Sequence, residues 1–259
     1  MQPENGSVSA VPDVIIIGAG FAGLSAGSYA RMNGLSTLVL EMGAIAGGLC
    51  TGWKRGAYTF DYCIHWLVGS APKHAFWDMW NELGLIKGRQ FVQHEVFRVF
   101  EHADGRQLVF HTDPARLQEH LSELFPGDRR AIRGMCRDIR NFSRFMLSEF
   151  SLRHPGRLIS ALPSLPSLIR LGRMGAGEYS MRFKDPWLRA VTAGFAYRPD
   201  MPVTGFLLTL GWMHSGAAGY PIGGSLPLAQ DLLARYRSLG GEIRFGSRVD
   251  RILVEAGRA

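Results

Sequence analysis

The stretch DVIIIGAGFAGLSAG, residues Asp13 to Gly27, decides the fold class of this 259-residue chain. The short apolar run 13–17 leads directly into three glycines, Gly18, Gly20 and Gly23. An apolar run followed by Gly-x-Gly-x-x-Gly is typical of a buried parallel strand, a tight turn and the first turn of a helix. The sequence therefore predicts the start of a βαβ unit.

The helix after this turn is expected to run to about Asn33, with Gly34 at the position of a C-terminal glycine. A second strand, Thr37–Leu40, then ends on Glu41. Strand, turn, helix, strand and acid together have the size of one βαβ unit. Small and apolar residues that recur at helical spacing support this helix: Ala22, Ala26, Tyr29 and Ala30.

The glycine turn predicts a site for the pyrophosphate of a dinucleotide, because a helix N-terminus offers backbone N–H groups and a partial positive charge. Gly18 makes the turn, Gly20 lets the backbone approach the phosphates, and Gly23 lets helix and strand pack closely. Glu41 is placed to accept hydrogen bonds from ribose hydroxyls, and an acid there disfavours the 2′-phosphate of NADP. A merely tight turn would explain Gly23 but would leave Gly20 and Glu41 without a purpose.

The residues after Glu41 favour FAD over NAD. A second glycine pair, Gly47-Gly48, follows six residues later, and a further close approach of the backbone suits a cofactor with a longer path. Residues 41–67, EMGAIAGGLCTGWKRGAYTFDYCIHWL, resemble the flavin-binding opening of the phytoene desaturase family. That family includes carotenoid desaturases and isomerases and retinol saturases, within the wider amine-oxidase-like flavoproteins. The resemblance returns in residues 220–253, YPIGGSLPLAQDLLARYRSLGGEIRFGSRVDRIL.

The resemblance implies an FAD-binding domain with the first three glycines on the pyrophosphate, Glu41 on the adenosine ribose and Val249 beside the adenine. One difference leaves the substrate open: carotenoid desaturases usually have a Gly-Pro pair after the Phe-Asp, whereas residues 62–66 here are Tyr-Cys-Ile-His-Trp. The predicted cofactor-binding residues are Gly18, Gly20, Phe21, Ala22, Gly23, Glu41, Met42, Gly47, Gly48, Leu49 and Val249.

The expected fold is α/β, a Rossmann-like FAD-binding parallel sheet interrupted by a mixed α+β substrate domain. Residues 1–72 and 219–259 form the two segments of the FAD-binding domain, and residues 73–218 form the substrate domain. We expect a hairpin over Phe91–His111 around Asp104-Gly105, a helix from Ser225 that this serine caps, and strands at Glu242–Phe245 and Val249–Glu255. Only short helices are expected from Ser151 to Gly177, where prolines interrupt the chain. A helix from about Pro126 carries a regularly spaced apolar face: Ile132, Met135, Cys136, Ile139, Phe142 and Phe145.

Composition limits the functional classes. Hydrophobic residues make up 46% of the chain, but no apolar run is long enough to span a membrane, so we expect a cytoplasmic protein. The net charge of +7 suits an anionic partner. Nucleic-acid motifs are absent from the sequence, which leaves peripheral contact with an anionic membrane through Arg153–Arg173 and its interleaved leucines. The cysteines Cys50, Cys63 and Cys136 lack metal-ligand spacing, so we predict free thiols and no metal site.

Other candidate residues have simpler explanations. His65 beside Trp66 could line the flavin site, but a packed, hydrogen-bonded histidine is the commoner case. Cys63 is expected to be an inert buried thiol. We name no catalytic residue, because in this chemistry the flavin performs the redox step. The aromatic segment AFWDMWNELGL is explained by core packing: Phe76, Trp77, Met79, Trp80 and Leu83.

The leading hypothesis is therefore an FAD-dependent oxidoreductase of the phytoene desaturase type, acting on a hydrophobic, polyene or isoprenoid substrate. The alternatives are an amine-oxidase-like flavoenzyme and a non-catalytic nucleotide-binding fragment that needs a partner. We also expect that these 259 residues do not complete their own flavin site. The resembling family continues with further strands and a late glycine-bearing segment, supplied here by a longer chain or a separate partner.

Overall fold

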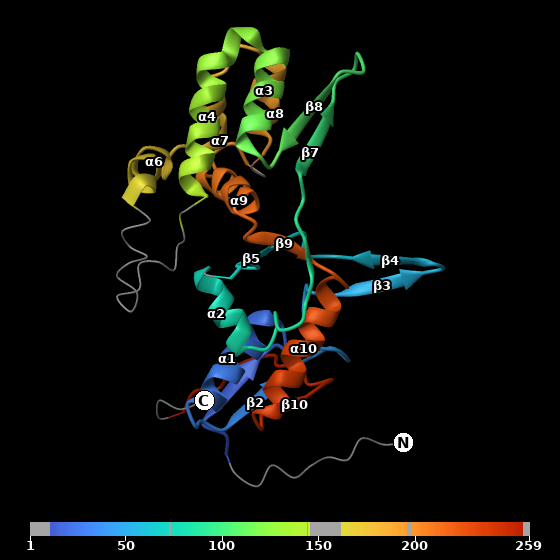
Figure 1. Ribbon diagram of the computed structural model, residues 1–259. Helices are drawn as coiled ribbons and strands as arrows, with labels where there is room; N and C mark the ends of the chain where they lie inside the picture. The colour runs from blue at the N-terminus through green and yellow to red at the C-terminus, as the bar shows by residue number, and fades with distance from the viewer. Residues whose placement is uncertain (1–10, 73, 144, 146–161, 196–197, 256–259) are drawn as a thin grey trace. The chain divides into compact units, whose positions relative to one another are not determined.

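The computed structural model describes residues 11–72, 74–143, 145, 162–195 and 198–255 (Figure 1). The chain forms two compact units, the first made of residues 1–65, 79–90 and 221–259 and the second of residues 66–78 and 91–220. Residues 79–90, which the predicted boundaries assign to the substrate domain, cluster with the first unit. Within the described residues, no helix is long and apolar enough to cross a membrane.

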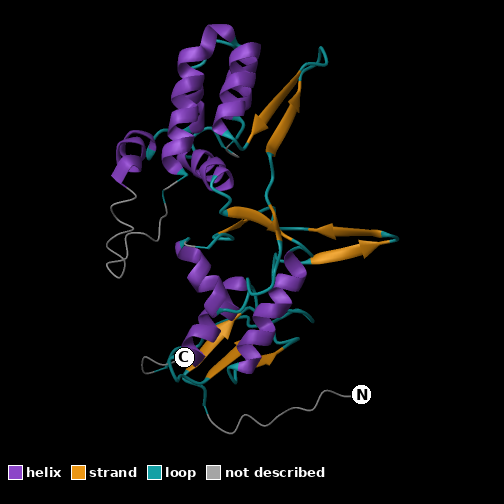
Figure 2. Cartoon of the chain, in the orientation of Figure 1, coloured by secondary structure: helices purple, strands orange, loops and turns teal. Residues whose placement is uncertain are grey.

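The first unit is built on a three-stranded parallel sheet in the order β1-β2-β10. These strands are β1 (Val14–Ile17), β2 (Thr37–Leu40) and β10 (Glu242–Arg244), and helix α1 (Phe21–Met32) connects the first two. The predicted βαβ unit is therefore confirmed, and Figure 2 shows its mixed α/β character. A small antiparallel hairpin of β3 (Gly52–Arg55) and β4 (Tyr58–Asp61) also belongs to this unit.

Helix α10 (Ser225–Ser238) lies beside α1. Their contact is close, because a Cβ atom at Gly27 would come within 2.7 Å of the ring of Tyr236. Tyr236 is completely buried, and its hydroxyl lies 2.8 Å from the hydroxyl of Thr37 and donates to the carbonyl of Glu242 at 2.9 Å. One side chain thus joins α10 to β2 and β10, which lie far apart in sequence.

The small and apolar residues that indicate helix α1 in the sequence are not the ones that it buries. Its buried residues are Leu24, Gly27 and Ser28, whereas Ala22 and Ala26 are exposed. The close packing of α1 against α10 leaves no room for a side chain at Gly27. The buried Ser28 hydroxyl donates a hydrogen bond to the Leu24 carbonyl at 2.8 Å. Residues that are not hydrophobic therefore occupy the tightest part of the interface.

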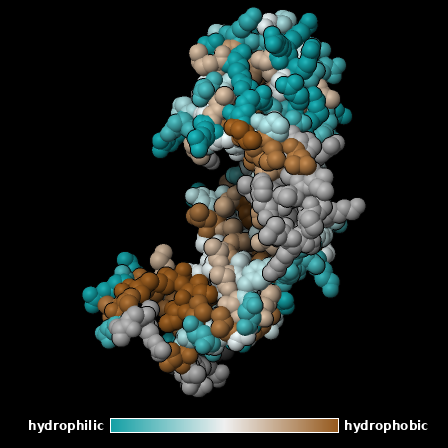
Figure 3. Space-filling view, turned by 90° about the vertical axis from the view of Figure 1, so that its left-hand side faces the viewer, coloured by the Kyte–Doolittle hydropathy of each residue, from teal (hydrophilic) through white to brown (hydrophobic). Residues whose placement is uncertain are grey.

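Strand β1 is only half-buried, which corrects the prediction of a fully buried strand. Ile15 and Ile17 are 50% and 53% exposed, and within the described residues β1 pairs with β2 alone. The predicted strand Val249–Glu255 is likewise absent from the described structure except for a bridge at Glu255, since extended residues become a strand only when another strand pairs with them. Figure 3 shows hydrophobic residues gathered on the first unit; its exposed apolar residues include Ile15, Ile17, Leu35, Ile252, Leu253 and Val254.

The second unit contains the predicted hairpin. Strands β7 (Val96–Glu101) and β8 (Gln107–His111) pair around Gly105, which has a φ of +84°. The first residues of the predicted segment instead form β6 (Phe91–Val92), which pairs into another sheet with β9 (Ala218–Pro221). The third strand of that sheet is β5 (Leu67–Val68).

Helices make the core of the second unit. They are α3 (Pro114–Leu124), α4 (Arg129–Phe142), α6 (Leu165–Leu171), α7 (Ala176–Ser180), α8 (Pro186–Ala193) and α9 (Thr204–His214), with single 3-10 turns at Pro126–Asp128 and Leu162–Ser164. The predicted apolar face of α4 is confirmed for its five residues up to Phe142, all of which are buried. The sixth predicted residue, Phe145, is also buried but lies beyond the end of the helix. Short helices near the prolines are also confirmed from Leu162 onward. Arg153, Arg157 and Leu158 lie outside the described residues.

Helix α2 (Ala75–Glu82) carries the predicted aromatic segment. Leu83 is buried and Phe76 packs against the core of the second unit, as expected. Met79, however, is 38% exposed, and Trp77 and Trp80 are half-buried. Core packing therefore explains only part of this segment.

Candidate dinucleotide-binding site

The glycine turn between β1 and α1 leads directly into the N-terminus of a helix. Gly18 adopts a φ of +95° and its N–H donates to the Leu40 carbonyl at 2.8 Å, which fixes the turn at the end of the sheet. Gly20 is the N-cap residue of α1 and offers no side-chain acceptor, and within the described part of the chain no other side chain is bonded to the first N–H groups of this helix. The first N–H groups of a helix have no partner within it, so this turn can donate hydrogen bonds to an anion.

The glycines of this turn answer to different constraints. A Cβ atom at Gly23 would lie 2.1 Å from the Gly18 carbonyl oxygen, so the fold itself requires glycine there. At Gly20 the backbone has φ −73° and ψ 177°, which other residues adopt readily, and a Cβ atom would meet nothing closer than 4.0 Å. The protein's own packing therefore does not require Gly20, and its missing side chain leaves open space beside the helix N-terminus.

The second glycine pair lies against the first turn. The Gly47 N–H donates to the Ala19 carbonyl at 2.8 Å, and Gly20 and Gly47 form a parallel bridge. A Cβ atom at Gly48 would lie 3.3 Å from the Gly20 Cα. The structure thus brings together two backbone segments that the sequence separates by more than twenty residues.

Glu41 has a structural role that sequence reasoning did not predict. One carboxylate oxygen accepts from the Ala19 N–H at 2.7 Å, and the other accepts from the Gly43 N–H at 2.7 Å. The carboxylate therefore fastens the end of β2 to the glycine turn. Each oxygen keeps a second lone pair, so an additional bond from a ribose hydroxyl remains available.

The remaining predicted residues surround this turn to different degrees. Phe21 and Ala22 belong to the first turn of α1, while Met42 and Leu49 are 73% and 68% exposed. Val249 is half-buried and follows Ser247, whose N–H donates to the Glu41 carbonyl at 2.8 Å. Contact between Val249 and an adenine stays a prediction.

A second feature of this unit, a long-range helix cap, was missed. The Asp61 carboxylate accepts from the Ser225 N–H at 3.1 Å, and the buried Ser225 hydroxyl accepts from the Ile64 N–H at 2.9 Å. The N-cap residue is Gly224, so the predicted capping role of Ser225 was wrong. Gly223 and Gly224, which precede the helix, have no side chain that could accept a hydrogen bond from its first N–H groups. Two glycines before a helix could therefore have indicated a cap from a distant acid.

A cavity of about 320 Å³ adjoins this cap. Its walls come from β3, β4 and the start of α10, and Trp53 and Phe60 stack beside it with ring centroids 5.8 Å apart. Both aromatic side chains remain more than 40% exposed. Apolar walls with few polar groups suit a hydrophobic ligand.

The cysteines differ in environment. Cys63 is exposed, which corrects the prediction of a buried thiol, and His65 is exposed as well. Burial, together with the neighbouring Cys63, raises the pKa of Cys50 to about 11, and burial raises the pKa of Cys136 to about 12. Among the described residues, no group of three or more His, Cys, Asp or Glu side chains could hold a metal ion.

Comparison with known proteins identifies the fold and the relatives. A family described as "NAD(P)-binding Rossmann-like domain" matches residues 16–83. The chain is 26% identical over 268 residues to prolycopene isomerase from Daucus carota, covering 95% of this chain and 42% of that protein. It is 23% identical over 270 residues to a lycopene-forming phytoene desaturase from a Paracoccus strain, covering 98% of this chain and 52% of that protein.

A solved structure of a putrescine oxidase mutant has the same fold, with a TM-score of 0.55 at 17% identity over 91% of this chain and 50% of that one. The first unit therefore contains a Rossmann-like domain. The chain is related to the phytoene desaturases and prolycopene isomerases, which confirms the predicted resemblance. It spans about half the length of the curated relatives it matches.

Proposed function

We propose that this chain carries the cofactor-binding part of an FAD-dependent oxidoreductase that acts on a hydrophobic substrate of the polyene or isoprenoid type. The open space at Gly20, bordered by Gly48 and the uncapped start of α1, is the observation that carries the proposal. Packing within the protein gives no reason for glycine at this position, whereas a pyrophosphate lying on the backbone does.

Each part of the turn has its own task in this proposal. The backbone N–H groups of the first turn of α1 bind the pyrophosphate, and Glu41 accepts from the adenosine ribose while holding Ala19 in place. Gly47 and Gly48 give the rest of the dinucleotide a path along the backbone. The bound flavin supplies the redox chemistry, so the chain's residues have to bind, orient and exclude water.

The hydrophobic substrate is supported by the cavity beside Trp53 and Phe60 and by the names of the curated relatives. An amine-oxidase-like activity is the alternative, supported by the fold shared with putrescine oxidase. Reduction of the bound flavin under anaerobic conditions, seen as loss of its visible absorbance, distinguishes the two activities. A polyene reduces the flavin of a desaturase-type enzyme, whereas a primary amine reduces the flavin of an amine-oxidase-like enzyme.

We further propose that the working enzyme includes polypeptide beyond these 259 residues, as a longer chain or a partner. The curated relatives are about twice as long, and β1 presents a strand with Ile15 and Ile17 half exposed. Parallel sheets are normally covered on both faces, so a further strand and cover layer would complete this one.

Flavin content and FAD affinity test the proposal together. We expect the isolated chain to retain little FAD after gel filtration but to bind added FAD saturably, as measured by quenching of flavin fluorescence. Stoichiometric FAD with substrate-dependent reduction would contradict the need for further polypeptide. A chain that binds neither FAD nor ADP would contradict dinucleotide binding and favour a non-catalytic fragment.

A further inference from the structure

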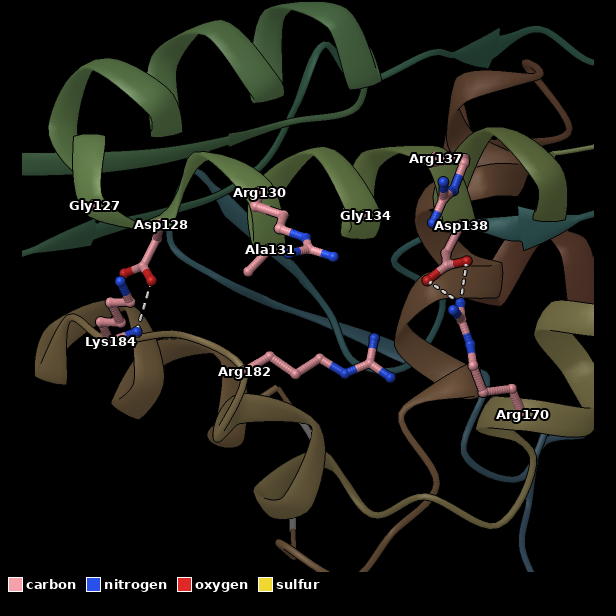
Figure 4. Close-up of a pocket in the computed structure, with 10 residues that line it drawn as sticks. All are labelled: Gly127, Asp128, Arg130, Ala131, Gly134, Arg137, Asp138, Arg170, Arg182 and Lys184. Atoms are coloured by element: carbon pink, nitrogen blue, oxygen red, sulfur yellow. Dashed lines mark hydrogen bonds and ion pairs between the residues drawn. The ribbon is translucent and has the colours of Figure 1, made fainter.

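A basic cavity in the second unit has no part in the proposed flavin function. It measures about 550 Å³ and is bounded by the start of α4, by α6 and by the segment between α7 and α8 (Figure 4). Five basic side chains and two carboxylates line it. We call it the arginine cavity, and its charged residues are Asp128, Arg130, Arg137, Asp138, Arg170, Arg182 and Lys184.

Both carboxylates are already engaged in holding the walls together. Asp128 is 3% exposed and accepts from the backbone N–H groups of Lys184 and Asp185 at 2.7 and 2.9 Å. Asp138 is 1% exposed and accepts from Arg170 at 2.6 and 2.8 Å and from the Ser167 hydroxyl at 2.9 Å. Asp138 is thus paired with Arg170, while Asp128 keeps its negative charge and is held by backbone N–H groups. Five basic side chains against two acids leave the cavity with an excess of positive charge.

The remaining cations face the same space. Figure 4 shows Arg130 and Arg137 from one side of α4 and Arg182 from the opposite wall reaching into the cavity. Among the described residues, neither Arg130 nor Arg137 has a carboxylate partner, and Arg182 lies over the ring of Tyr179 at 4.5 Å. A Cβ atom at Gly134 would meet nothing within 4 Å, so the helix surface between the two α4 arginines is open.

We infer that the arginine cavity binds a phosphate-bearing anion through Arg130, Arg137 and Arg182. Guanidinium groups match the geometry of phosphate oxygens and bind them through paired hydrogen bonds. The phosphate belongs either to a small soluble molecule or to a lipid headgroup. The second source is relevant because Ile169, next to Arg170, is 82% exposed.

Binding of inorganic pyrophosphate, measured by calorimetry at low ionic strength, tests the site. In a protein that carries Gly20→Ser, which blocks the glycine turn of the other unit, we expect one saturable site. Its affinity falls tenfold or more when Arg137→Gln is added, or Gly134→Leu, which fills the cavity without changing charge. Added to the same background, Arg116→Gln, which removes an exposed charge from the same unit, leaves the affinity unchanged. Circular dichroism verifies that each variant is folded.

Sedimentation with vesicles distinguishes the source of the phosphate. Binding to phosphatidic acid vesicles, but not to phosphatidylcholine vesicles, that depends on Arg137 and Gly134 assigns the site to a headgroup. Pyrophosphate binding without vesicle binding assigns it to a soluble phosphate. The inference is overturned if neither probe binds saturably, or if Arg116→Gln weakens binding as much as Arg137→Gln does.

Discussion

The glycine turn and the arginine cavity are both suited to anions, but they achieve this by opposite means. The glycine turn uses backbone N–H groups and the absence of side chains, with no basic residue among Gly18 to Gly23. The arginine cavity uses long cationic side chains, which outnumber the two buried acids that hold its walls, Asp128 and Asp138. The glycine turn can therefore be recognised in the sequence by its glycines. The arginine cavity can be recognised only in the fold, which shows which arginines lack a carboxylate partner among the described residues.

The largest effect is expected from Gly23→Ala. The new Cβ atom would lie 2.1 Å from a backbone oxygen that cannot move without opening the turn. Overpacking of this kind costs about 3 kcal/mol or more when backbone must shift. Urea unfolding followed by circular dichroism measures the loss. An unchanged midpoint would contradict the assigned packing of β1 against α1.

The second prediction concerns the rate at which the cysteines near the two regions react with an alkylating reagent. Cys50 follows the second glycine pair and Cys136 lies on α4, and burial raises the pKa of both thiols, to about 11 and about 12. A rise from 9.0 to about 11 lowers the thiolate fraction at pH 8 about a hundredfold. Alkylation followed by peptide mass spectrometry should label the exposed Cys63 first, Cys50 much later and Cys136 last. Early labelling of Cys136 would show that the helical core opens readily.

Gly20→Ser separates binding from folding. Serine is a good N-cap residue and its Cβ atom fits without contact, so stability should stay the same or rise slightly. The side chain would occupy the space proposed for the pyrophosphate and compete for the same N–H groups. We expect FAD or ADP affinity to fall tenfold or more, about 1.4 kcal/mol. Loss of stability with unchanged affinity would reverse the role given to Gly20.

Gly134→Ala gives the smallest effect and serves as the matched control for Gly23→Ala. Gly134 lies inside helix α4 with open space around its Cα, so alanine should stabilise the protein by about 0.5 to 1 kcal/mol. FAD affinity should not change, because the residue lies in the other unit. A lower unfolding midpoint of Gly134→Ala in urea would contradict the open space around Gly134, because it would mean that the added methyl group meets other atoms.

Local patterns predicted the parts of the fold that depend on local physics. The turn at Gly18–Gly23 and the hairpin at Gly105 were predicted from local turn motifs, and the apolar face of α4 was predicted from residue spacing. Features that depend on distant partners were not. Asp61 caps a helix that starts at Ser225. Ile15 and Ile17, which share one face of β1, are half exposed, because burial of a sheet face depends on covering elements that are distant in sequence.

The candidate site shows the same division. The glycine turn and the pair Gly47-Gly48 were predicted, because closely spaced glycines are visible in the sequence. The bonds from Glu41 to Ala19 and Gly43 were missed, because a carboxylate that can accept from ribose can equally accept from backbone. Free charges in the arginine cavity depend on the engagement of Asp138 by Arg170, 32 residues away.

The most direct test of the central claim is a titration of the isotopically labelled protein with ADP, followed by backbone amide NMR. ADP contains the adenosine and the pyrophosphate and does not require any part of the site that encloses a flavin. Our account predicts saturable shifts of the amides of Gly18 to Gly23 and of Gly47 and Gly48, which disappear in Gly20→Ser. Saturating ADP that leaves these amides unshifted would contradict dinucleotide binding at this turn.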